Sequence, residues 1–196
     1  MKILKLVLVI FVSFLLNNIS QAKDPSDLIN GIVNEASLVL KSSDPVESKI
    51  IKLNDIAERS VDISGIGMYA LGKHKKEISE EQKTKYNKLF RSYFLKSFSS
   101  RLVDYTDPKI NVVSQKKINK KYTIVNSILE ATSKRPQVKI DWRIYTKNPE
   151  KPLIRDLIVE GLSLARTQKE EFNSVIQNND GDLNALFKTL EEFLIK

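Results

Sequence analysis

The spacing of apolar residues predicts helices in the first part of the chain. Apolar side chains recur every three or four positions in residues 25–40, 46–57 and 63–72, which is the period of an amphipathic helix. The second segment follows Asp44, an acidic residue that we expect to cap the helix, with Pro45 at its first position. We therefore expect a helix over each of these segments.

A longer helix is predicted after them. Ser79 and Gln82 have the spacing of a capping box, in which two side chains reciprocally satisfy free backbone N–H groups. The helical period then continues to about Asp104. Aromatic and leucine side chains fall along one side of this helix: Tyr86, Phe90, Tyr93, Phe94, Phe98 and Leu102. Such a stripe is usually core packing, but its size also suits the wall of an apolar ligand cavity.

Apolar and mostly polar residues alternate in the middle of the chain. Val138, Ile140, Trp142 and Ile144 show the clearest alternation, which predicts a half-buried strand. The predicted strands cover residues 112–115, 122–131, 138–146 and 153–159. Because short turn segments such as 116–121 separate them, we expect an antiparallel sheet.

The helical period returns near the end of the chain. Residues 162–176 and 183–194 each show it, and residues 180–182, Asp-Gly-Asp, predict a turn and a helix cap between them. The sequence therefore predicts an α+β fold, in which a curved antiparallel sheet of about four strands is packed with helices.

The first residues are typical of a secretory signal peptide. Lys2 and Lys5 precede an apolar run over residues 6–16, and the small residues Ser20 and Ala22 follow it. The run is shorter than the roughly 20 residues that a membrane span needs. The alternative is an uncleaved N-terminal anchor.

Cleavage after Ala22 would separate a signal peptide, residues 1–22, from a single exported domain, residues 23–196. The formal net charge would fall from +8 to +6, because Lys2 and Lys5 leave with the signal. The chain has no cysteine, which excludes a disulfide scaffold, an iron–sulfur protein and a lipoprotein anchor. We expect an exported protein of a bacterial envelope.

Candidates for catalysis are few. The single histidine, His74, lies among lysines, and we expect it to be a solvated loop residue rather than part of a triad. Asp156 and Glu160 are four apart on the last predicted strand, which suits either a carboxylate pair or a structural, capping role. The glycines at 65 and 67 predict close contact between helices.

Lysines cluster at residues 73–76 and again at Lys116, Lys117, Lys120 and Lys121. Each cluster suits a solvated turn. Each also suits a surface that attracts anionic lipid headgroups or an acidic protein partner. We do not expect binding of nucleic acid.

A set of short segments is typical of one protein family. Residues 155–163 read Arg-Asp-Leu-Ile-Val-Glu-Gly-Leu-Ser. The supporting segments are 68–72, 79–82, 90–94 with Leu102, Trp142-Arg143, and Arg166 with Glu171-Phe172. In this order they resemble the MlaC, or toluene-tolerance, family of periplasmic phospholipid-binding proteins. Two residues depart from the family pattern: Leu162 stands where Val is common, and Arg155 where an aromatic or neutral residue is common.

The resemblance implies a cone of the nuclear-transport-factor-like kind, in which the sheet and helices enclose an apolar cavity for the acyl chains of one phospholipid. It implies a soluble carrier that takes lipid between an inner-membrane ABC transporter complex and an outer-membrane lipoprotein complex, and so maintains outer-membrane lipid asymmetry. Neither a catalytic residue nor a metal or other cofactor is expected.

Spacing and resemblance together predict ten lipid-contacting residues: Tyr69, Phe90, Tyr93, Phe94, Phe98, Ile140, Trp142, Ile144, Leu157 and Leu162. Two alternatives remain. One is an enzyme of the same cone-shaped fold that uses Asp156, and the other is an adaptor with a solid core. A ligand-sized cavity would distinguish the carrier from the adaptor.

Overall fold

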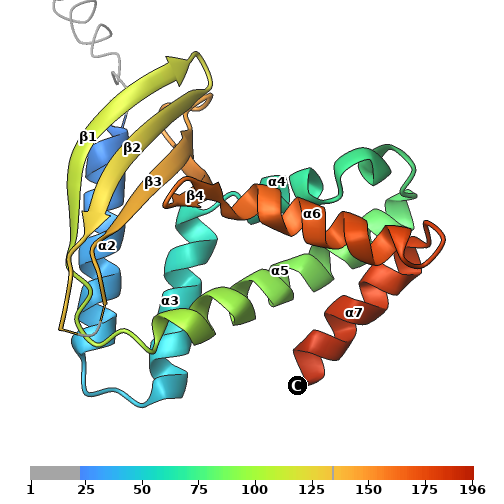
Figure 1. Cartoon of the computed structure of the whole chain (residues 1–196), viewed down its shortest axis with the longest axis horizontal. Helices are drawn as coiled ribbons and strands as arrows, with labels where there is room; N and C mark the ends of the chain where they lie inside the picture. The colour runs from blue at the N-terminus through green and yellow to red at the C-terminus, as the bar shows by residue number, and fades with distance from the viewer. Residues whose placement is uncertain (1–22, 134) are drawn as a thin grey trace, which may run out of the picture.

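A curved antiparallel sheet lies at one end of the molecule and most of the helices extend from it (Figure 1). The computed structural model describes residues 23–133 and 135–196, so the predicted signal peptide lies outside the described residues. The strands are β1 (Ile110–Asn119), β2 (Tyr122–Leu129), β3 (Val138–Tyr145), β4 (Leu153–Val159) and β5 (Leu162–Ser163), in that order across the sheet. The α+β prediction is confirmed, with a short fifth strand that the sequence did not indicate.

The helices agree closely with the predicted segments. They are α2 (Pro25–Lys41), α3 (Val46–Ser60), α4 (Ile63–Ala70), the short 3₁₀ helix η1 (Gly72–Lys76), α5 (Glu80–Leu102), α6 (Leu164–Gln177) and α7 (Leu183–Ile195). No helix among the described residues is long and apolar enough to span a membrane.

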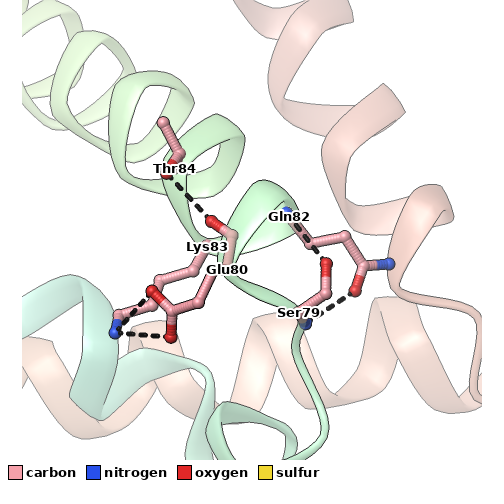
Figure 2. A network of polar contacts seen from close by, with 5 residues as sticks. All are labelled: Ser79, Glu80, Gln82, Lys83 and Thr84. Carbon is pink, nitrogen blue, oxygen red and sulfur yellow. Dashed lines mark hydrogen bonds and ion pairs between the residues drawn. The ribbon is translucent and has the colours of Figure 1, made fainter.

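The predicted capping box begins α5 (Figure 2). The Gln82 N–H donates to Ser79 Oγ at 3.1 Å, and the Ser79 N–H donates to Gln82 Oε1 at 3.0 Å. Glu80 lies in the same first turn, where its charge opposes the positive end of the helix dipole. The start of α5 is therefore fixed by local sequence, as predicted.

One face of the sheet packs against α2, which runs alongside it (Figure 1). Val125, Trp142 and Ile144 form this buried layer with Ile29 and Val33 of α2. The Trp142 Nε1–H donates to Ser127 Oγ at 2.8 Å, so the indole is satisfied inside the layer. This face is therefore buried against α2.

A second core lies among α4, α5, α6 and α7. Tyr86 and Phe90 of α5 meet Phe172 of α6 edge-on, with ring centroids 6.5 and 6.0 Å apart. Burial raises the pKa of Tyr86, so its hydroxyl stays protonated and donates to the Gly67 carbonyl at 2.8 Å. Much of the predicted aromatic stripe therefore holds the helices to one another.

Replacing Gly67 with alanine should destabilise this helical core. A Cβ atom at residue 67 would lie 2.7 Å from the Phe90 ring, whereas nothing lies within 4 Å of a Cβ at Gly31 in α2. We expect Gly67→Ala to cost about 1–3 kcal/mol of unfolding free energy, and Gly31→Ala to add about 0.5–1 kcal/mol. Chemical denaturation measures both variants. Equal effects of the two substitutions would contradict the close contact of α4 with α5.

Some predictions about single residues were wrong. Pro45, not Asp44, is the N-cap of α3, and no side chain caps this helix; Asp44 instead forms an ion pair with Lys52 at 2.6 Å. Leu162 lies on β5 rather than in α6 and is 58% exposed. His74 is buried in η1, with Nδ1 3.1 Å from Glu77 Oε2, whereas its lysine neighbours had suggested a solvated loop.

The lysine segment 116–121 also differs from the prediction. It is not a turn throughout, because β1 continues to Asn119 and only Lys120 and Lys121 occupy the connection to β2. Lys116 pairs with Ile124 and Lys117 with Thr123, so both are strand residues. The result is a longer hairpin than the sequence indicated.

Candidate functional site

A β-bulge in β4 decides which residues face away from α2. Arg143 of β3 pairs with Asp156, but its neighbour Ile144 pairs with Ile154, which leaves Arg155 as the extra residue. A bulge of one residue reverses the faces on either side of it. Ile154 therefore joins Ile144 in the core against α2, whereas Asp156 lies with Arg143 on the opposite face.

A pocket of about 420 Å³ lies on that opposite face, between the sheet and helices α4 and α6. Its wall comes from the ends of β1 and β2, the middle of β3 and β4, two residues of α4 and one residue near the start of α6. The lining residues are Gly65, Tyr69, Ile118, Asn119, Tyr122, Ile124, Arg143, Arg155, Asp156 and Ala165. The wall thus combines apolar side chains with two arginines.

Arg155 is held firmly by its neighbours. It forms an ion pair with Asp62 at 2.6 Å, donates to the Tyr122 hydroxyl at 3.0 Å and stacks over the Tyr145 ring at 3.9 Å. Burial lowers the pKa of Arg155, but the bonds to Tyr122 and Asp62 outweigh burial and raise it overall. Arg155 is therefore a permanent cation whose charge Asp62 largely neutralises.

Asp156 has a structural role. The residue is 3% exposed, and its carboxylate accepts hydrogen bonds from Ser163 Oγ at 2.6 Å and from the Ala165 N–H at 3.0 Å. Glu160 does not join it, because Glu160 lies in the turn after β4 and accepts from the Lys139 N–H. The interpretation of Asp156 as a structural, capping residue is confirmed by these contacts.

Arg143 is the cation of the pocket with most freedom to bind a ligand. Its side chain is 43% exposed, and its ion pair with Asp156 is 3.4 Å long. The Asp156 oxygens already accept two shorter hydrogen bonds. An anionic group at the pocket could therefore compete for the guanidinium, which presents donors in a planar fork suited to carboxylate or phosphate oxygens.

The structure does not bring the ten predicted lipid-contacting residues together. Phe90, Tyr93, Phe94 and Phe98 belong to the helical core. Ile140, Trp142, Ile144 and Leu157 belong to the core against α2. Tyr69 and Leu162 are exposed, and of the ten residues only Tyr69 lines the pocket. Contact of any of the ten with lipid stays a prediction.

Sequence reasoning missed most of the pocket. Ile118 lies in the segment 116–121, which the sequence predicts as a turn. Arg155 lies in the predicted strand 153–159, where nothing marks it as the extra residue of a bulge. The alternation through β2 could have found Tyr122 and Ile124, because they share a face opposite the buried Val125. Within residues 23–133 and 135–196, no group of three or more acidic or histidine side chains could hold a metal ion.

Comparison with known proteins supports the fold and then shows the family. The fold matches a phospholipid-binding protein from Ralstonia solanacearum, solved in complex with a phospholipid, with a TM-score of 0.75 and 20% sequence identity over 89% of this chain and 100% of that one. Residues 30–192 match the MlaC protein family. The chain therefore belongs to the MlaC family. Among curated proteins, no sequence matches this chain significantly.

Proposed function

We propose that this protein binds one phospholipid at the pocket between the sheet and helices α4 and α6, and carries it through the periplasm. The single observation that carries the proposal is the wall of the pocket, where Ile118, Ile124 and Ala165 lie beside the partly exposed Arg143. An amphiphile with an acyl chain and an anionic phosphate suits both parts of this wall. Membership of the MlaC family supports the same ligand class.

The size of the pocket suits part of a lipid. An apolar cavity of 150 Å³ holds one benzene ring, so by the same proportion a pocket of 420 Å³ holds about 17 carbons, or one acyl chain. We place one chain inside and the second against the rim, where Ile118 is 52% and Tyr69 45% exposed. The phosphate would lie at Arg143.

Transport requires such a protein because lipid cannot cross water unaided. Exposing roughly thirty methylenes of a diacyl lipid costs on the order of 25 kcal/mol. A soluble carrier offsets this cost by covering the chains, and we propose that it shuttles between an inner-membrane ABC transporter complex and an outer-membrane lipoprotein complex. In that role the protein is a carrier and not an enzyme, and it serves outer-membrane lipid asymmetry.

A transfer assay tests the carrier function. Donor vesicles carry a self-quenched fluorescent phospholipid, and acceptor vesicles carry none. We expect the protein to speed the rise in fluorescence in proportion to its concentration, because each molecule moves one lipid at a time. A rate that does not depend on protein concentration would contradict the carrier role.

A further inference from the structure

The end of the sheet beside the pocket carries an unbalanced positive charge. Two connections meet there, the hairpin between β1 and β2 and the loop between β3 and β4, because alternate turns of an antiparallel meander lie at the same end. The Thr146 N–H donates to the Lys121 carbonyl at 2.8 Å, which joins the two connections. These connections and the adjoining end of β1 carry Lys116, Lys117, Lys120, Lys121, Lys147 and Lys151.

These lysines lack acidic partners. Across the described ranges of the chain, none of the six forms an ion pair. The acids at this end are Glu150 in the second loop and Asp24, which binds Gln115 at 2.9 Å. Every residue from 113 to 121 is exposed, so the hairpin extends beyond the core. The charge therefore faces outward, toward whatever approaches this end.

One apolar side chain stands among the lysines. Ile118 is 52% exposed, and it also lines the pocket together with Asn119. Lysines around an exposed apolar residue suit a membrane interface, because the ammonium groups attract lipid phosphates while the apolar side chain enters the headgroup region. An acidic protein surface would account for the lysines but not for an isoleucine at the mouth of the pocket.

We propose that this basic end, defined by the six lysines and Ile118, docks on an anionic phospholipid membrane and so places the pocket mouth against the bilayer. The membrane surface is the occupant because it alone uses both the charge and the apolar tip. Docking would let lipid enter and leave the pocket, and this part of the proposal rests on the proposed function. The docking itself does not require that lipid be bound.

Vesicle flotation tests the docking. The protein is mixed with vesicles of equal phosphatidylglycerol and phosphatidylcholine, or of phosphatidylcholine alone, at 50 and 300 mM salt. We expect binding to the anionic vesicles only, and much weaker binding at the higher salt because exposed charges are screened. Absence of binding to anionic vesicles at low salt would overturn the proposal and favour an acidic protein partner.

Two charge-matched variants locate the surface. The first replaces Lys116, Lys117, Lys120 and Lys121 with glutamine, and the second replaces Lys73, Lys75, Lys76 and Lys88, all exposed and distant in sequence, with glutamine. We expect the first to bind anionic vesicles roughly 100- to 1000-fold more weakly, and the second to lose about tenfold or less. Equal losses would overturn the proposal, because net charge alone would then explain binding.

Two further measurements separate docking from lipid binding. Ile118→Thr should weaken vesicle binding without changing its salt dependence, because it replaces an exposed apolar side chain and changes no charge. Unchanged binding would overturn the role of Ile118. The four-lysine hairpin variant should retain the same amount of co-purified lipid as the wild type. If the wild type docks but carries no lipid, the proposed function fails and the docking proposal stands.

Discussion

Ile124→Glu is expected to remove most of the bound phospholipid from the purified protein. Ile124 lines the pocket and pairs across the sheet with Arg143. A glutamate at this position places a charge where the acyl chain would lie, and its carboxylate competes with a lipid phosphate for Arg143. We expect the lipid recovered per protein molecule to fall at least tenfold, roughly the effect of a 1.4 kcal/mol loss. Phosphate analysis of organic extracts measures it.

The matched control is Ile128→Glu. Ile128 lies on the same strand and, by the alternation of β2, on the same face, but it does not line the pocket. It should retain lipid at the level of the wild type. Equal loss in both variants, or retention in both, would place the lipid elsewhere, for example against the predicted residues Phe94 and Leu162.

Asp156→Ala is expected to be the most destabilising single substitution near the pocket. It leaves the buried Ala165 N–H without an acceptor and frees Ser163, so the start of α6 is no longer fixed to β4. An unsatisfied buried donor costs about 1–3 kcal/mol, and we expect a total of about 3 kcal/mol with the lost Ser163 bond. For a chain of this size the melting temperature should fall by roughly 6–12 °C.

Asp182→Ala is the control for this prediction. Asp182 caps α7 through a hydrogen bond to the Asn184 N–H at 2.9 Å, but it is exposed. Loss of such a cap costs about 1 kcal/mol. Thermal unfolding followed by circular dichroism compares the two variants. If Asp156→Ala were no more destabilising than Asp182→Ala, Asp156 would not have the structural role described here.

Local signals in the sequence predicted the elements of the fold well. The capping box at Ser79, the first helix predicted over residues 25–40 and the alternation around Trp142 each depend on neighbours a few residues away, and each is confirmed. The close approach at Gly67 also followed from local composition. Such features need no knowledge of distant contacts.

The faces of the sheet could not be predicted in the same way. The bulge at Arg155 reverses the alternation of β4, and no local rule marks it. Beyond it, Ile154 packs against α2 while Asp156 lines the pocket, which also collects Ile118, Ile124 and Arg143 from the other strands. His74 was also misjudged, because its side chain is buried although the lysines on either side of it are exposed.

The central claim is that this protein carries one phospholipid. Native mass spectrometry of the purified protein measures the intact complex directly, and organic extraction identifies what is released. We predict a one-to-one complex whose added mass equals that of a diacyl phospholipid. A protein that shows only its bare polypeptide mass, with no phospholipid in the extract, would contradict the claim.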